Sequence, residues 1–212
     1  MSPAGEEPAT AMARFLASLE LDYARWREGD GYDLEALRAL TPSEQEVALA
    51  LLRERLEGPG AGWREVEAVA ALALPAARRF LRELEWHDVA EIRLRAAVLA
   101  PDGESRGTVE REVLRLLQDP ATDIGADAVM RRAEEHPEPA IREALLWCAV
   151  DGAPHLRVHA AALALYLAGG AREPFDWAHR PLFLRFGEQP REERQAALAE
   201  LLARMERGSP PG

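Results

Sequence analysis

Apolar residues recur at helical spacing through most of the chain. Intervals of three and four residues separate the members of three stripes: Val66, Val69, Ala70 and Ala73; Val109, Val113, Leu116 and Leu117; and Leu198, Leu201, Leu202 and Met205. Residues at these intervals lie on one face of an α-helix. The pattern therefore predicts a series of amphipathic helices, each of which buries one face.

Glycine, proline and capping residues divide this pattern into short helices. Thr41-Pro42-Ser43-Glu44 combines an N-cap threonine, a proline at the first helical position and a capping-box glutamate, and Asp33 precedes another helix. Helices are predicted at residues 10–27, 34–40, 42–56, 63–73, 75–86, 88–99, 105–118, 123–135, 138–150, 154–168 and 190–206. Short connections between such helices are typical of antiparallel helix pairs.

The composition favours an all-α fold. Val, Ile and Thr, which favour strands, number 10, 3 and 4 among 212 residues, whereas Ala and Leu dominate. A hydrophobic content of 48% favours a folded chain over a disordered one. We expect residues 1–30 to form an N-terminal helical cap, residues 31–206 a helical-repeat domain and residues 207–212 a disordered tail.

Three segments share a local pattern that suggests repeated helices. Residues 90–97, 140–145 and 155–161 each place an arginine after an aliphatic residue and continue with alanine and other apolar residues. The spacing between them is irregular. Each segment nevertheless predicts a helix with an exposed arginine on one side and close-packed alanine on the other.

Longer stretches carry a resemblance to a known family. They are residues 159–167 (HAAALALYL), 173–177 (EPFDW) and 180–186 (RPLFLRF), with a similar stretch at 62–68 (GWREVEA). On these residues the chain resembles HEAT-like α-helical repeat proteins, in particular an uncharacterised bacterial group, over roughly residues 30–205. The resemblance implies a right-handed α-solenoid of antiparallel HEAT-like helix pairs that binds a ligand on its concave face.

The chain is acidic, and its charge is uneven. It carries 37 acidic and 26 basic residues, for a formal charge of -11, and residues 1–60 hold 12 of the acidic and 6 of the basic ones. Nucleic-acid binding needs a basic surface that neutralises phosphates. We therefore expect no nucleic acid and a protein partner that is itself basic.

The sequence also bears on location and on the cysteine. The first residues lack the basic and apolar regions of a signal peptide, and the longest apolar run, residues 160–168, is shorter than the ~20 residues of a membrane span. We expect a cytoplasmic protein with no membrane partner. Cys148 is the single cysteine and has apolar neighbours, which predicts a buried, inert thiol.

Three residue pairs suggest enzyme chemistry as an alternative to a binding role. His155 and His159 share a helical face at metal-ligand spacing, but no third ligand is evident, and no histidine precedes glutamate as in HEAT-like di-iron hydroxylases. We therefore expect no metal and no cofactor. The alternative function is a nucleic-acid-acting enzyme similar to helical-repeat DNA glycosylases, in which Asp176 with Trp177, or Glu143 with Trp147, would hold a base.

Other chemistries have less support. A tetrapyrrole site like that of phycobilin lyases has no specific residues here, and the glycine-rich residues 58–62 lack the ending of a P-loop. The five serines have no context for nucleophilic catalysis. We predict that the chain is not an enzyme.

Two groups of aromatic and acidic residues are predicted to contact a partner. The first group is Tyr23, Trp26, Tyr32 and Asp33, and the second is Asp176 and Trp177. In the alternative interpretation, Tyr23 and Trp26 cover the end of the core, and residues 175–186 form a lid over the last helices. The function predicted overall is a non-catalytic protein-binding helical-repeat module: an immunity-type inhibitor that blocks a basic bacterial toxin, or an adaptor.

Overall fold

The computed structural model describes residues 10–20, 31–100 and 105–208. Every regular element in these ranges is an α-helix or a 3-10 helix, so the all-α prediction is confirmed for them. The chain forms two compact units, Met1–Ser105 and Arg106–Gly212. Within the described residues, no helix is long and apolar enough to cross a membrane.

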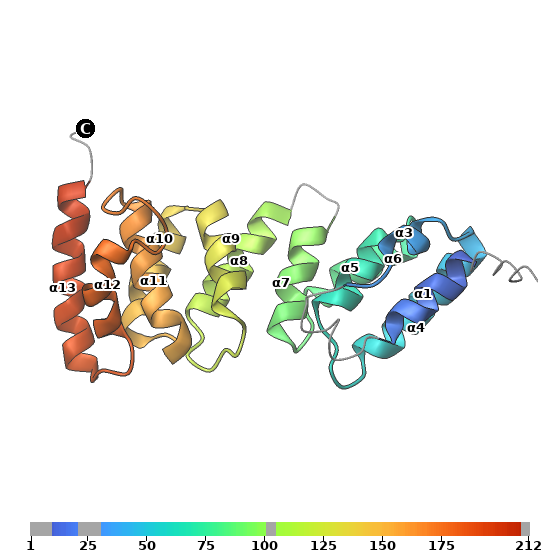
Figure 1. Cartoon of the computed structure of the whole chain (residues 1–212), viewed down its shortest axis with the longest axis horizontal. Coiled ribbons are helices and arrows are strands. Elements are labelled where there is room, and N and C mark those ends of the chain that lie inside the picture. The colour runs from blue at the N-terminus through green and yellow to red at the C-terminus, as the bar shows by residue number, and fades with distance from the viewer. Residues whose placement is uncertain (1–9, 21–30, 101–104, 209–212) are drawn as a thin grey trace, which may run out of the picture. The chain divides into compact units, whose positions relative to one another are not determined.

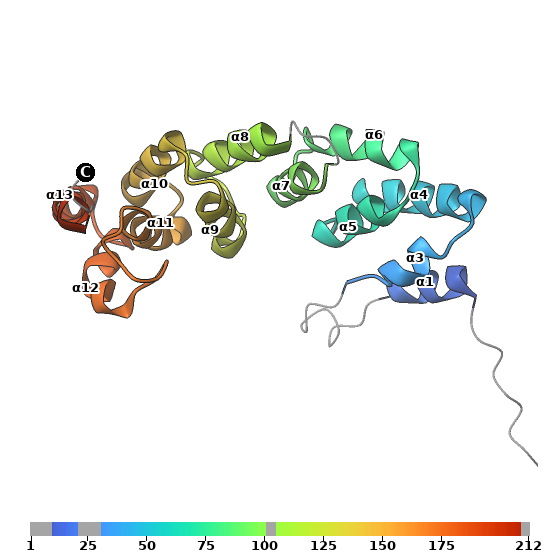
Figure 2. The ribbon, with the colours of Figure 1, turned by 90° about the horizontal axis from the view of Figure 1, so that it is seen from above.

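The first unit is built around α5. Its helices are α1 (Ala11–Leu19), α3 (Leu34–Arg38), α4 (Pro42–Leu56), α5 (Trp63–Ala71), α6 (Pro75–Leu84) and α7 (Ala90–Leu99) (Figure 1). Helix α5 contacts α3, α4, α6 and α7, and Figure 2 shows these helices side by side. Helix α1 packs on α3 at one side of this group.

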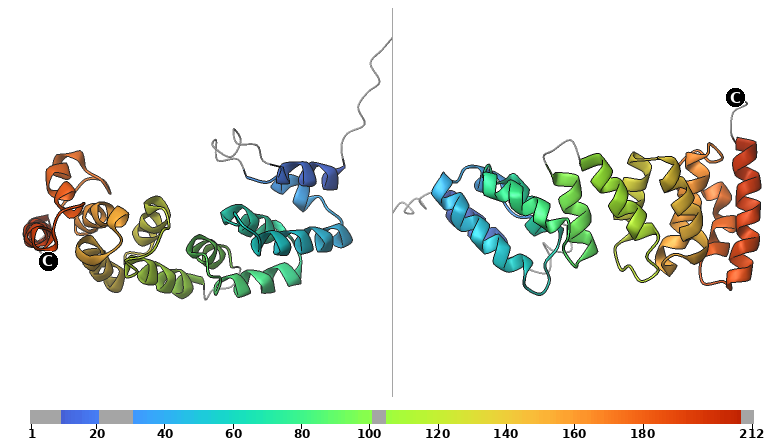
Figure 3. Two further views of the ribbon diagram at one scale, coloured as in Figure 1. Left: turned by 90° about the horizontal axis from the view of Figure 1, so that it is seen from below. Right: turned by 180° about the vertical axis from the view of Figure 1, so that it is seen from behind.

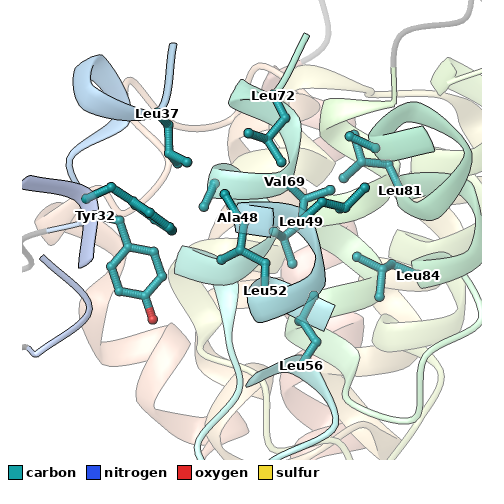
Figure 4. Packing of buried hydrophobic residues seen from close by; sticks show 14 of the residues in the cluster. Tyr32, Leu37, Ala48, Leu49, Leu52, Leu56, Val69, Leu72, Leu81 and Leu84 are labelled. Atoms are coloured by element: carbon teal, nitrogen blue, oxygen red, sulfur yellow. The ribbon is translucent and has the colours of Figure 1, made fainter. Parts of the chain in front are cut away.

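Leucine, valine and alanine side chains fill the core of the first unit. Leu52 of α4, Val69 of α5 and Leu81 of α6 meet there (Figure 4), and Phe15 of α1 is fully buried in the same cluster. The predicted stripe on α5 is buried at Val66 and Val69, but Ala73 is exposed because the helix ends at Ala71. The hydrophobic spacing thus predicted the buried face of α5 but placed the end of the helix two residues too late.

The second unit is built around the pair α10 and α11. Its elements are α8 (Ser105–Leu117), α9 (Ala126–Glu135), α10 (Pro139–Asp151), α11 (Pro154–Leu167), η1 (Trp177–His179), α12 (Arg180–Phe183), η2 (Leu184–Phe186) and α13 (Arg191–Gly208). Helices α10 and α11, joined through Gly152 and Ala153, form the most extensive helix pair. Helix α13, red in Figure 3, packs on both of them.

Most helix starts agree with the capping residues. The Thr41 side chain accepts a hydrogen bond from the Glu44 backbone N–H, and the Glu44 side chain accepts one from the Thr41 N–H, so the predicted capping box is present. Asp33 caps α3, as predicted. Proline opens α4, α6, α10 and α11.

Three predictions about element boundaries are corrected. The first helix ends at Leu19 instead of residue 27, because Glu20 leaves the helical conformation (ψ 68°). Residues 177–186 form three short helical elements that the apolar spacing did not predict. Helix α13 continues through Gly208, although we expected a disordered tail from residue 207.

The last predicted stripe is also corrected in part. Leu201 is fully buried, but Leu202 is 39% exposed, and Leu198 and Met205 are half-buried. Helix α13 therefore presents a narrower buried face than the four-residue stripe suggested.

Four arginines make a recurrent contact, and three of them belong to the repeated segments. Arg93, Arg142, Arg157 and Arg194 lie near the starts of four helices, and each donates from its guanidinium to the backbone carbonyl five residues earlier. We expected exposed arginines in the three repeated segments, but Arg93 is buried; Arg194, which lies outside those segments, is buried as well. Because buried carbonyls need hydrogen-bond partners, these arginines fix the turns that precede their helices.

Candidate functional site

Tyr32 lies in the core and not on the surface. Its side chain is 7% exposed, and its ring lies at the edge of the apolar cluster with the hydroxyl directed away from the leucines (Figure 4). The hydroxyl donates to the Glu65 Oε1 atom. Burial and the neighbouring Glu65 carboxylate raise the pKa of Tyr32 to about 12. A ring this buried offers a partner little surface, so we do not propose Tyr32 as a contact residue.

Asp33 has a structural role beside Tyr32. Its Oδ1 atom accepts from the Ala36 backbone N–H at 2.8 Å, and its Oδ2 atom accepts from the Arg14 guanidinium at 2.7 Å. The Ala36 N–H and the Arg14 guanidinium hold the pKa of the Asp33 carboxyl below its usual value. Asp33 therefore caps α3 and ties it to α1. Tyr23 and Trp26, predicted to act with these residues, lie outside the described residues.

A hollow of about 430 Å³ lies beside this cluster. It is lined by the linker from Gly58 to Ala61 and by residues of α1, α4 and α5, including Arg55 and Glu65. Glu65 also accepts from the Gly62 backbone N–H at 3.0 Å, and its carboxylate lies 3.6 Å from Arg55 Nε. Glu65 is thus bonded to its neighbours in this wall, which assigns it a structural role.

Asp176 holds the loop that carries the second predicted pair. Its two carboxylate oxygens accept from the backbone N–H groups of Arg172, at 3.2 Å, and Ala178, at 2.9 Å. The two N–H groups lower the pKa of the Asp176 carboxyl. Asp176 therefore acts as a clamp that closes residues 172–178 into a fixed loop, and its contacts are used within the loop.

Trp177 is presented at the surface by this loop. Its side chain is 68% exposed, and the Arg180 guanidinium lies 5.3 Å from the centroid of its ring. The Phe175 ring packs edge-on against Trp177 and also contacts the rings of His159 and Phe183. Residues 175–186 thus bury Phe183 and Phe186 as a lid would, while Trp177 stays accessible as a partner-contacting residue would. The partner contact of Trp177 and the alternative lid role remain predictions.

The most exposed aromatic side chain of the described residues is Trp86, which the sequence interpretation missed. It is 85% exposed and stands in the turn between α6 and α7. The buried Arg93 guanidinium donates to the backbone carbonyls of His87, at 2.7 Å, and Asp88, at 2.8 Å. The acidic residues on either side of Trp86 were the available signal in the sequence. The sequence had predicted a helix over residues 75–86, which placed Trp86 inside it, whereas α6 ends at Leu84.

The residues of the enzyme alternatives have other surroundings. His155 Nε2 lies 2.8 Å from the Ile124 carbonyl oxygen, and His159 packs against Phe175. Within the described ranges, no three His, Cys, Asp or Glu residues are grouped as metal ligands. Trp147 is 39% exposed on α10. Cys148 is fully buried, and burial raises the pKa of its thiol to about 12, so the prediction of a buried thiol is confirmed.

Comparison with known proteins gives this chain no relative. No protein-family model matches it, and no curated protein or solved structure matches it either. Proposals about its function therefore rest on the residues and contacts described above.

Proposed function

We propose that this chain is a non-catalytic protein-binding module that binds a basic protein through the Trp86 turn of its first unit. The observation that carries this proposal is the 85% exposure of Trp86 on a turn held by two hydrogen bonds from Arg93. Tryptophan is enriched among the residues that dominate binding energy. Because Arg93 holds the turn, little conformational freedom is lost when a partner packs on it.

The charge around Trp86 favours a basic partner. Glu83 and Asp88 are exposed on either side of Trp86, and Glu85 is half-buried next to it. The first unit carries 20 acidic and 12 basic residues, for a formal charge of -8. Such a field steers a basic protein to the surface, and a lysine or arginine of that partner can lie over the indole ring.

The architecture that we propose for this module is an α-solenoid of antiparallel HEAT-like helix pairs. The recurrent arginine contact supports it, because Arg93, Arg142, Arg157 and Arg194 repeat one turn geometry along the chain. Proline-opened helices and short connections also support it. An inhibitor that covers a basic toxin, or an adaptor, would use such a scaffold.

A peptide titration tests the proposed anchor. The five tryptophans give five indole N–H signals in a proton–nitrogen correlation spectrum, and the Trp86 signal is assigned from its loss in Trp86→Phe. We expect the lysine-rich peptide KKFKK to shift the Trp86 signal saturably, and the uncharged peptide QQFQQ to leave it in place. The shift should shrink as salt is raised from low to moderate concentration.

Matched variants separate the anchor from general acidity. Trp86→Ala should weaken KKFKK binding by about tenfold, as expected for an aromatic anchor. Val47→Ala, which truncates another exposed apolar residue of the first unit, should not change it. Equal binding of KKFKK to Trp86→Ala and to the unaltered chain would contradict the proposal.

A further inference from the structure

The second unit carries a different surface, formed by Arg172, Trp177 and Arg180. We propose that Arg172 and Arg180 bind carboxylate groups of an acidic segment of a partner protein, and that an apolar side chain of this segment packs on Trp177. This surface consists of other residues, on the other unit, than the Trp86 turn. The proposal does not depend on the basic partner proposed above.

The first argument is that the donors of these two arginines are unused. Within the described residues, the Arg180 guanidinium makes its cation–π contact with Trp177 and no hydrogen bond or ion pair. The Arg172 backbone N–H donates to Asp176, and its guanidinium makes no hydrogen bond or ion pair there, although its charge helps to lower the pKa of the Asp176 carboxyl. A guanidinium presents five N–H donors in a planar fork that matches a carboxylate.

Two other arginines of the second unit do have carboxylate partners. Arg185 donates to the carboxylates of Glu193 and Glu200, and Arg204 donates to Glu200 and lies 2.9 Å from His179 Nδ1. Glu193 and Glu200 are therefore taken up by Arg185 and Arg204, whereas Glu173, next to Arg172 in the chain, is exposed. Asp176 is occupied by two backbone N–H groups.

The second argument is a hollow beside Arg172. A hollow of about 460 Å³ is lined by residues 169–172 on one side and by Asp176, Ala178 and His179 on the other. This volume suits one or two side chains of a bound peptide. Gly169, Gly170 and Arg172 are among the lining residues, and Asp176 connects this hollow to Trp177, the next residue in the chain.

The third argument is that the aromatic part of the surface is rigid. The Asp176 clamp fixes the loop, and Phe175 holds the Trp177 ring at a centroid distance of 6.0 Å. The Arg180 guanidinium is stacked on the same ring and so is oriented before a ligand arrives. A surface arranged in advance loses less free energy on binding than a flexible one.

The charge of the chain favours a short acidic segment over a nucleic acid. The second unit has a formal charge of -3 from 17 acidic and 14 basic residues, within a chain of -11. A polyanion is repelled by this net charge over many phosphates, whereas two or three carboxylates pair locally with Arg172 and Arg180.

The test titrates the chain with the acidic peptide EEFEE and follows the indole N–H signals. We expect a saturable shift of the Trp177 signal, assigned from Trp177→Phe, and no shift of the Trp86 signal. QQFQQ should produce no shift. A ten-nucleotide oligothymidylate should bind more weakly than EEFEE.

Charge variants test the two arginines. Arg172→Gln and Arg180→Gln should each weaken EEFEE binding by about tenfold, in keeping with a charge-assisted bidentate contact. Arg180→Lys keeps the charge but loses the planar fork of donors. Its affinity for EEFEE should lie between those of the unaltered chain and Arg180→Gln. Arg131→Gln, which removes an exposed arginine of α9 in the same unit, should have no effect.

Several results would overturn this inference. They are the absence of a Trp177 shift with EEFEE at millimolar concentration, an equal shift with QQFQQ, or tighter binding of the oligothymidylate. Unchanged EEFEE affinity in Arg180→Gln, with the other indole signals at their original positions, would overturn it as well.

Discussion

Cys148 offers a direct test of burial at a single atom. Because the thiol is fully buried and burial raises its pKa to about 12, almost no thiolate forms near neutral pH. We expect a disulfide reagent at pH 8 to modify the native chain at least about a hundredfold more slowly than the denatured chain. Denaturation should release one reactive thiol per chain. Rapid modification of the native chain would show that α10 does not pack as described.

Tyr32 predicts a dependence of stability on alkaline pH. Its pKa is raised from 10.0 to about 12 in the folded chain, so the neutral phenol is favoured by folding. Below pH 10 the phenol is neutral in both states and its contribution to stability is complete, whereas this contribution is lost as pH rises toward 12. Tyr32→Phe should cost about 1 kcal/mol at pH 8, because the hydrogen bond to Glu65 is removed.

The pH series separates this effect from a simple loss of packing. Above pH 10, the stability of the unaltered chain should fall toward that of Tyr32→Phe, since the variant has no phenol to ionise there. Urea unfolding of both chains at several pH values measures this difference. If the free energies of unfolding of the two chains changed in parallel from pH 8 to the highest pH measured, this result would argue against the buried Tyr32–Glu65 contact.

Single residues were the least predictable part of the candidate site. The aromatic–acidic pattern selected Tyr32 and Trp177 alike, but one ring is 7% exposed and the other is 68% exposed. Local sequence does not determine which side chain meets the core, because that depends on helices distant in the chain. Asp33 and Asp176 were similarly selected for binding, although both cap short helices.

The arginine contacts at helix starts predict a graded effect on stability. Arg93 is buried and donates to two carbonyls, whereas Arg142 is exposed and donates to one. We expect Arg93→Met to lower the free energy of unfolding by about 2–3 kcal/mol, because it leaves two carbonyls without their charged donor. Arg142→Met should cost less than about 1 kcal/mol, since water replaces the lost donor. Urea unfolding followed by circular dichroism measures the free energy of unfolding of both variants. Equal losses in the two variants would contradict the role of Arg93 in holding its turn.

The Asp176 loop predicts a local effect and a response to acid. Asp176→Ala should speed hydrogen exchange at the Arg172 and Ala178 amides by about tenfold, because both lose their acceptor. The exposed Glu188→Ala, with the same change of charge, should not. In the unaltered chain the pKa of the Asp176 carboxyl is lowered by folding. The clamp is therefore intact above the ordinary pKa of an aspartate, and it is lost as the pH falls through the lowered pKa of the folded chain. Unchanged exchange in Asp176→Ala would contradict the clamp.

Helices were more predictable than their ends. Periodic apolar residues, the capping box at Thr41 and the prolines at helix starts identified α4 to α11 within a few residues. The helical elements of residues 177–186 were not predicted, because elements of three or four residues are too short to show a helical period of apolar residues. Helix α1 was overextended because its residues favour helix throughout, while Glu20 ends it through backbone conformation.

The charge of the whole molecule is divided unevenly between its two units. The first unit carries -8 and the second -3, and the exposed tryptophans stand in different surroundings: Trp86 beside Glu83 and Asp88, and Trp177 beside Arg180. The sequence revealed the acidic balance and favoured a basic partner. It could not reveal the unpaired arginines of the second unit, because ion pairing depends on which acids reach them in the fold.

The central claim is that the first unit recruits a basic protein through Trp86, and affinity capture from the source cells tests it most directly. The unaltered chain, Trp86→Ala and Val47→Ala are each used as bait at low and moderate salt, the captured protein is identified by mass spectrometry, and it is then purified to measure its affinity. We predict a stoichiometric basic protein that is lost as salt rises. Its affinity should be about tenfold weaker for Trp86→Ala and unchanged for Val47→Ala. A captured protein that is acidic, or that binds Trp86→Ala as tightly as the unaltered chain, would contradict the claim.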